Sequence, residues 1–175
     1  MTSARIPRAA LLAACLLASV GCASLPAADA AAGPTLADYE AIHATLYRYT
    51  RGLDRHDVEL YASAFAEDGV FDLGATSYTG RDAMRGIIEG LIQNHAEAAA
   101  RGDPPRQLFH TDTNQSIEFL APDHAVHHAY YVTYVRVGEG QGSTNQLVAV
   151  GSSTDELRKI EGEWLIVKRT VTSGP

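Results

Sequence analysis

Apolar residues recur at helical spacing over the first half of the chain. Ile42, Leu46, Tyr49 and Leu53 fall on one face of a helix, and Thr35 has the type and position of its N-cap. The pattern therefore predicts a helix that begins after Thr35 and ends near Leu53.

Two more helices, separated by a short strand, are predicted downstream. Asp57 suits the N-cap of the second helix, which residues 65–69 close. Residues 70–73 alternate as a strand, and after a loop a third helix spans residues 80–101. Pro104 and Pro105 prevent any continuation of that helix.

Beyond residue 105 the periodicity changes from helix to strand. Turn residues separate four long segments, at 106–121, 125–137, 144–159 and 163–172. Long strands joined by short turns predict an antiparallel meander, and a sheet of that length curls. Three helices followed by a bent sheet predict an α+β domain over residues 36–173.

The N-terminus has the pattern of a secretory signal over residues 1–22. Basic residues precede an apolar run at 9–20, which ends in small residues. Ser19-Val20-Gly21-Cys22 is similar to a bacterial lipobox, whose cysteine becomes lipidated. We therefore expect an exported protein, either periplasmic or membrane-anchored as a lipoprotein through Cys22.

A different processing site stays open. Cleavage after Ala28 or Ala30 would release the protein without a lipid. Residues 23–35 are rich in alanine and proline without any period, which predicts a tether ahead of the domain.

Composition narrows the possible chemistry and partners. Both cysteines, Cys15 and Cys22, lie in the predicted signal, so the domain has no internal disulfide and no thiolate nucleophile. The chain has 14 basic and 21 acidic residues, a net charge of −7, and loss of Arg5 and Arg8 with the signal makes it more negative. This charge argues against a nucleic-acid partner.

Asp54 is a candidate functional residue because it lies in the elbow between the first two predicted helices. The apolar face of the first helix ends there, so Tyr49 and Asp54 could enter the same cavity. The alternative is that Asp54 caps the helix end or pairs with Arg51 or Arg55 in solvent.

His110 is the second candidate, within a polar patch at residues 108–114 of the first long strand. Simple alternation places His110 and Ile117 on opposite faces, but a bulge between Asn114 and Ile117 would place them on the same face. The alternative is a strand histidine that is exposed or satisfied locally.

Several short motifs follow one another in an order that resembles the SnoaL-like branch of the NTF2-like superfamily. They are Tyr49…Leu53-Asp54…Asp57, Phe65-Ala66-Glu67-Asp68-Gly69, Gly80-Arg81-Asp82-Ala83, His110…Asn114 and Gly151…Asp155…Leu157…Gly162-Glu163-Trp164. The resemblance covers roughly residues 36 to 173. It implies an NTF2-like cone, with three N-terminal helices packed on a strongly bent antiparallel sheet that encloses a deep apolar pocket. Because this fold hosts many functions, function has to be argued from the site.

The same resemblance implies a catalytic set. In scytalone-dehydratase-like and bile-acid-dehydratase-like members, an aspartate at the position of Asp54 orients a histidine at the position of His110, and the bile-acid type has a tyrosine at Tyr49. The chain departs from these patterns at Leu53, where the scytalone type has a tyrosine, and at Thr133, where the bile-acid type has a second aspartate.

An Asp–His pair of this kind can abstract a proton α to a carbonyl, with Tyr49 donating to the developing enolate. The predicted function is a cofactor-free dehydratase or isomerase acting on a hydrophobic, carbonyl-bearing small molecule. The alternative is a small-molecule-binding domain without catalysis.

Four residues have secondary roles in this prediction. Asp72 matches the base of ketosteroid-isomerase-like members, and Asn114 lies in the polar strand patch. Asp155 and Ser153 belong to the SnoaL-like run, where Asp155 either lines the pocket or pairs with Arg158 or Lys168.

The sequence predicts neither a metal nor a cofactor. His124, His127 and His128 crowd one strand, but adjacent residues face opposite sides of it. There is no phosphate-binding glycine loop and no Gly-x-Ser-x-Gly elbow. A homodimer is expected, because a partner commonly covers the open sheet face in this superfamily.

Overall fold

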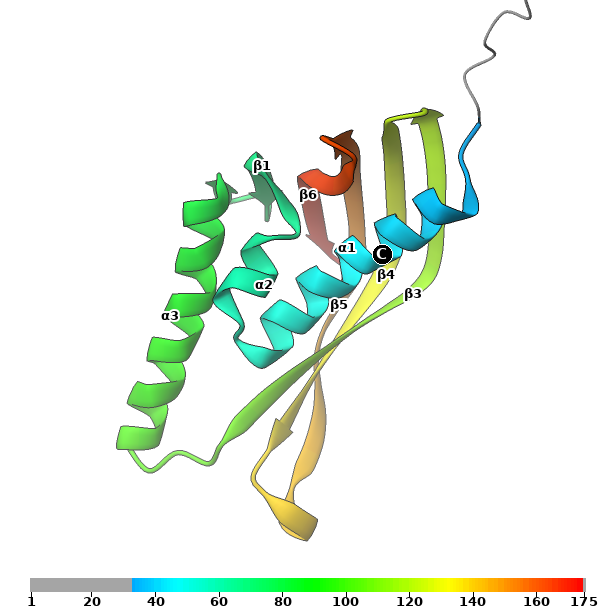
Figure 1. The fold of residues 1–175 in the computed structure, drawn as a ribbon. Coiled ribbons are helices and arrows are strands. Elements are labelled where there is room, and N and C mark those ends of the chain that lie inside the picture. The colour runs from blue at the N-terminus through cyan, green and yellow to red at the C-terminus, as the bar shows by residue number, and fades with distance from the viewer. Residues whose placement is uncertain (1–32, 175) are drawn as a thin grey trace, which may run out of the picture. The chain divides into compact units, whose positions relative to one another are not determined.

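The computed structural model describes residues 33–174, and in them three helices lie on one side of a curved, six-stranded sheet (Figure 1). Thr35 and Asp38 form a capping box that starts the first helix. The elements in chain order are α1 (Leu36–Arg55), α2 (Val58–Ala62), β1 (Phe65–Asp72), β2 (Ser77–Thr79), α3 (Arg81–Ala100), β3 (Arg106–Ala121), β4 (His124–Val137), the short 3₁₀ helix η1 (Gly140–Gly142), β5 (Thr144–Ile160) and β6 (Glu163–Ser173).

The sheet is mixed, whereas the sequence predicted an antiparallel one. Its strand order is β2-β1-β6-β5-β4-β3, and every pairing is antiparallel except that of β1 with β6. After the β1–β2 hairpin the chain crosses through α3 to the opposite edge. The meander β3–β6 then returns, and its last strand arrives beside β1 in the same direction.

The end of the second predicted helix is wrong. Helix α2 stops at Ala62, and residues 65–69 belong to β1, where Phe65 pairs with Ile166 of β6. Phe65 continues the helical spacing of the preceding apolar residues, which misled the prediction. The backbone of Phe65 pairs instead with β6, a strand a hundred residues away. Local periodicity carries no information about that pairing.

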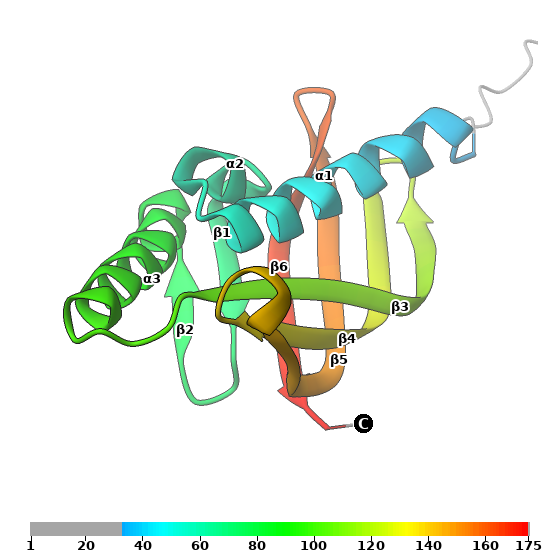
Figure 2. The same ribbon diagram turned by 90° about the horizontal axis from the view of Figure 1, so that it is seen from below.

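The core lies between the helices and the concave face of the sheet. Its largest fully buried side chains are Trp164, Tyr61, Phe65, Ile42, Met84, Ile88, Leu157 and Ile166. The long strands β3, β4 and β5 bend beneath α1 (Figure 2). Lys159 Nζ and Trp164 Nε1 also donate to Asp38 Oδ1, at 2.8 and 3.0 Å, which holds the start of α1 on the sheet.

The α1–α2 elbow requires a glycine at position 52. A Cβ built on Gly52 would overlap the backbone of Tyr61 in α2. The close approach fixes the angle between the two helices, and therefore the direction in which the end of α1 presents its side chains.

We expect Gly52→Ala to destabilise the protein by about 1–3 kcal/mol, the usual cost of overpacking a close contact. Gly86→Ala in α3 is the matched control, since nothing lies within 4 Å of its added Cβ. The control should stabilise by about 1 kcal/mol through helix propensity. Urea unfolding of both variants measures the difference, and equal effects would show that the elbow tolerates the methyl group.

Candidate active site

The end of α1 directs Asp54 toward the sheet. His56 adopts a left-handed conformation (φ 54°) as the C-cap, and Asp57 accepts from the backbone N–H of Leu60 as the N-cap of α2. The chain therefore turns sharply after Arg55. Asp54, in the last turn of α1, is buried, with 7% of its surface exposed.

Asp54 contacts His110 of β3 through both its ring and its backbone. Asp54 Oδ1 lies 2.6 Å from His110 Nδ1, and the backbone N–H of His110 donates to Oδ1 and Oδ2 at 3.1 and 3.3 Å. The Gln107 side-chain amide donates to the backbone carbonyl of Asp54. Asp54 and His110 therefore lie within hydrogen-bond reach of each other.

This geometry selects one form of the imidazole. A carboxylate only accepts hydrogen bonds, so Nδ1 of His110 carries the proton that it shares with Asp54. The other ring nitrogen, Nε2, makes no hydrogen bond to any described residue, and 18% of the side chain is exposed. His110 therefore presents an available lone pair to solvent or to a ligand.

A bulge in β3 brings His110 to the inner face. Thr113 pairs with Tyr130 and Ser116 with His128, so β3 has one residue more than β4 between these two pairs. Asn114 takes the left-handed conformation (φ 51°) that the bulge requires. The exposed Asn114 thus acts through the backbone and is not part of the site.

A second polar cluster lies deeper, on the inner face of β4, β5 and β6. Arg169 Nη1 donates to both carboxylate oxygens of Asp155 at 2.7 Å. His127 Nδ1 lies 2.9 Å from Asp155 Oδ2, and its Nε2 lies 3.2 Å from Gln115 Oε1. Arg169, Asp155 and His127 are each at most 2% exposed.

The second cluster keeps its charges despite its depth. Burial acts to raise the pKa of Asp155, but the Arg169 charge and the His127 hydrogen bond outweigh it and lower that pKa. Burial acts to lower the pKa of Arg169, and the charge of Asp155 raises it above the ordinary value. The two side chains therefore form an ion pair inside the core.

Tyr49 belongs to this deeper cluster. The Arg169 guanidinium carbon lies 4.1 Å from the centre of the Tyr49 ring, which also packs against Tyr61, Phe65 and Phe71. Burial raises the pKa of Tyr49, so its hydroxyl stays protonated and able to donate.

Asp72 lies outside this arrangement. Its carboxylate accepts from the backbone N–H of Gly74 at 2.9 Å and lies 3.6 Å from Lys168 Nζ. Phe71 faces the core, so its neighbour Asp72 points to the opposite face of the sheet. This orientation removes the support for Asp72 as an isomerase-type base.

The predictions for Asp155 and Ser153 have different outcomes. Asp155 is buried as expected, but its partner is Arg169, and neither Arg158 nor Lys168 takes that place. Ser153 is 2% exposed, and its hydroxyl has no hydrogen-bond partner among the described residues. Arg169 and His127 were missed, although both are polar residues at inward positions of their strands, which is a signal in the sequence.

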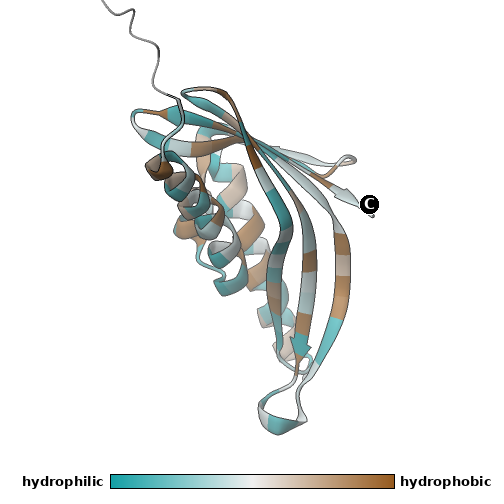
Figure 3. Cartoon of the chain, turned by 90° about the vertical axis from the view of Figure 1, so that its right-hand side faces the viewer, coloured by the Kyte–Doolittle hydropathy of each residue, from teal (hydrophilic) through white to brown (hydrophobic). Residues whose placement is uncertain are grey.

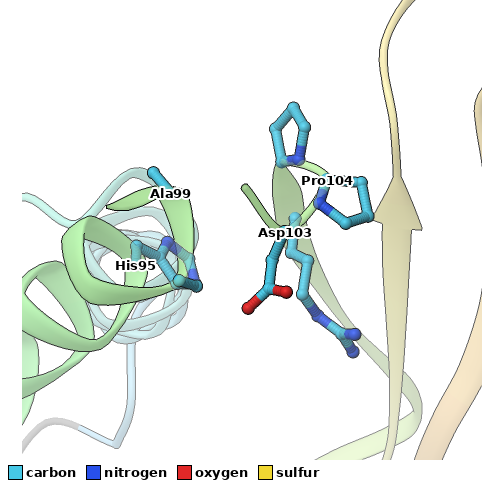
Figure 4. A pocket seen from close by; sticks show the side chains of 7 residues that line it. His95, Ala99, Asp103 and Pro104 are labelled. Atoms are coloured by element: carbon cyan, nitrogen blue, oxygen red, sulfur yellow. The ribbon is translucent and has the colours of Figure 1, made fainter. Parts of the chain in front are cut away.

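A cavity of about 220 Å³ opens between the C-terminal end of α3 and the start of β3, four residues before His110 (Figure 4). It is lined by His95, Ala98, Ala99, Asp103, Pro104, Pro105 and Arg106. The ring of His56 contacts that of His95 at 4.6 Å between centres. The elbow that carries Asp54 therefore packs against the wall of this cavity.

Within residues 33–174, no three His, Cys, Asp or Glu side chains are grouped so that they could hold a metal ion. No helix of the same range has the length and apolar character needed to cross a membrane. The predicted signal and Cys22 lie outside the described residues.

The sequence profile of the SnoaL-like domain matches residues 34–170. The chain therefore belongs to the SnoaL-like domain family, as the order of its motifs indicated. No curated protein matches the chain.

Solved structures show the same NTF2-like, cystatin-like fold. A protein of unknown function from Nostoc punctiforme is 24% identical with a TM-score of 0.64, over 81% of this chain and 95% of that one. Two proteins from Novosphingobium aromaticivorans are each 23% identical with a TM-score of 0.62. One is provisionally named a scytalone dehydratase and aligns over 80% of this chain and 86% of its own; the other is an NTF2-like protein that aligns over 79% and 82%.

We expect Arg169→Met to destabilise the protein by about 3–5 kcal/mol, because it leaves the buried Asp155 carboxylate without its partner. The double variant Arg169→Met/Asp155→Leu should recover most of that loss. Thermal or urea unfolding of the two single variants and the double variant forms the thermodynamic cycle. Additive losses would show that the two side chains do not depend on each other.

Proposed function

We propose that the protein is a cofactor-free dehydratase or isomerase that acts on a hydrophobic, carbonyl-bearing small molecule, with His110 as the base. The observation that carries this proposal is the 2.6 Å contact between Asp54 Oδ1 and His110 Nδ1, which leaves His110 Nε2 unbonded. A histidine held in this way has one nitrogen committed to orientation and the other available for proton transfer.

The reaction begins with removal of a proton from the carbon next to the carbonyl. His110 Nε2 takes this proton, and negative charge develops on the carbonyl oxygen. Tyr49, kept protonated by its burial, is the proposed donor to that oxygen. The proton then goes to a departing hydroxyl in a dehydration, or to another carbon in an isomerisation.

Two independent lines support this assignment. The chain belongs to the SnoaL-like family, and one structural neighbour at 23% identity is provisionally named a scytalone dehydratase. The chain itself supplies an oriented imidazole at His110 and, in the deeper cluster, the buried phenol of Tyr49. The fold alone does not determine the reaction, because it hosts many functions. The second line is therefore needed, since it concerns the residues of this chain.

The alternative is a binding domain that holds such a molecule without converting it. Thr133, opposite His110 on β4, supports it, because a hydroxyl there replaces the second aspartate of the bile-acid type. Leu53, which is half-buried, also supports the binding domain, because the scytalone type has a tyrosine at that position. The cavity beside the elbow would then be the binding site.

We further propose that the protein is exported, as a periplasmic protein or as a lipoprotein anchored through Cys22. The order of basic, apolar and small residues at the N-terminus supports it. The mass of the mature protein from its native host identifies the processed end, and an unprocessed Met1 would contradict export.

The outer face of the sheet supports a homodimer. Phe109, Tyr134 and Leu147 are cross-strand partners on β3, β4 and β5, and 42–59% of each side chain is exposed. Hydrophobic residues recur along these strands (Figure 3). A row of this kind on a monomer would leave a contiguous apolar patch in water.

We expect His110→Ala to reduce dehydration or isomerisation by about 10²–10⁴-fold, the usual cost of losing a general base. Asp54→Asn should also reduce turnover, because an amide can hold the opposite tautomer. Asp72→Asn is the matched control, an aspartate outside the site that should retain activity. The assay follows dehydration of the aldol adduct of benzaldehyde and acetone, with melting curves to verify folding. A fully active His110→Ala variant would exclude His110 as the base, and a wild type without activity would favour the binding domain.

We expect the wild-type chain without its signal to be dimeric by light scattering after size exclusion, and Tyr134→Glu to make it monomeric. A charge in the centre of the apolar row would have to be buried without a partner in the dimer. Tyr47→Glu is the control, because Tyr47 is 59% exposed on α1, away from the sheet. A monomeric wild type would rule out the dimer.

A further inference from the structure

Asp112 follows His110 by two residues on β3 and faces the same side of the sheet. The bulge at Asn114 comes after both residues, so their common orientation follows from the regular part of the strand. Asp112 is half-buried, opposite Tyr131 of β4. Asp112 was not predicted as a site residue from the sequence.

The Asp112 carboxyl differs from the acids of the two polar clusters, Asp54 and Asp155. Asp54 accepts hydrogen bonds from His110, and Asp155 accepts from Arg169 and His127. The side-chain oxygens of Asp112 accept no hydrogen bond from any described residue. Other side chains therefore hold the first two carboxyl groups in place, whereas no described residue donates to the third.

Asp112 also lies within electrostatic range of both polar clusters. The imidazole of His110 acts on its carboxyl from β3, and His127, Asp155 and Arg169 act on it from β4, β5 and β6. Asp112 in turn acts on the hydroxyl of Tyr49 from α1. Burial is the largest influence on Asp112 and raises its pKa, which favours the protonated acid.

We propose that Asp112 is the acid of the site, and that the substrates are β-hydroxy carbonyl compounds. This inference rests on the proposed function, in which His110 is the base. It adds a second catalytic residue and selects dehydration over isomerisation.

The elimination then balances between two side chains. His110 Nε2 takes the proton from the α-carbon, and the electrons of that C–H bond form the C=C double bond. The C–O bond to the β-carbon breaks, and the departing hydroxyl takes the proton of the Asp112 carboxyl to leave as water. His110 ends protonated and Asp112 ionised, and proton transfer through solvent restores both.

The spacing of His110 and Asp112 on β3 fits their separate roles as base and acid. Residues i and i+2 of a strand have Cα atoms about 6–7 Å apart. Side chains on one face at that spacing can reach the α-hydrogen and the β-oxygen of one bound molecule from its two ends. With a single histidine, both proton transfers would have to occur at the same nitrogen.

Two reactions separate the acid from the base. Dehydration of the aldol adduct of benzaldehyde and acetone needs a base and an acid, because hydroxide is a poor leaving group. Ring opening of nitrobenzisoxazole needs only the base, because its phenolate leaves without a proton. Both are measured on the full mature chain for the wild type, Asp112→Asn and His110→Ala. Glu118→Gln, an exposed carboxylate on the same strand, is the matched control.

We expect Asp112→Asn to lose about 10²–10⁴-fold in dehydration and to retain ring opening within about twofold, well under 1 kcal/mol of barrier. His110→Ala should lose both reactions, and Glu118→Gln neither. In the wild type, dehydration should decline as the pH rises and Asp112 ionises, whereas ring opening should show no such decline. The pH profiles need no variant, so they test the assignment even if Asp112→Asn fails to fold.

The other outcomes are distinct. Normal dehydration by Asp112→Asn, or identical pH profiles for the two reactions, overturns the acid role and leaves His110 as the base. If a folded Asp112→Asn variant loses both reactions, Asp112 acts through His110. This outcome also overturns the acid role. A wild type no faster than His110→Ala in either reaction refutes the proposed function, and the role of Asp112 with it.

Discussion

The single extra residue in β3 determines the chemistry of the inner face. Side chains alternate along a strand, so an insertion of one residue reverses the orientation of everything on one side of it relative to the other. Ile117 and Phe119 pack against the core beyond the bulge, and His110 and Asp112 face the same interior before it. Without the bulge, the strand could bury its apolar end or its polar end, but not both.

The polar groups inside the domain are organised as two separate units with different physical roles. The Arg169–Asp155–His127 cluster is buried and linked by hydrogen bonds across β4, β5 and β6, so it can hold three strands together but has little capacity to exchange protons with a ligand. The Asp54–His110 pair lies at the edge of the core and keeps one nitrogen open. Depth therefore distinguishes the structural unit from the reactive one, although both contain a histidine and an aspartate.

Local signals in the sequence were sufficient for the first and third helices, the start of the second and the four long strands, whereas the pairing of Asp54 with His110 came from the resemblance to the SnoaL-like family. Thr35 and Asp57 act as the predicted N-caps, and β3 spans the predicted residues. The parallel pairing of β1 with β6 was beyond such reasoning, because its register depends on a contact between Phe65 and Ile166 across most of the chain. Arg169 was missed for a related reason: a charged residue in a strand reads as exposed until its buried partner is known.

The parallel pairing has a further consequence for how the protein is made. β6 is the last strand of the domain to be synthesised, yet it lies between β1 and β5 in the middle of the sheet. Until it emerges from the ribosome, β1 and β2 have no neighbour that joins them to the meander, and the nascent chain cannot close its core. Such a domain cannot complete its fold before β6 is available, whatever the order in which its helices form.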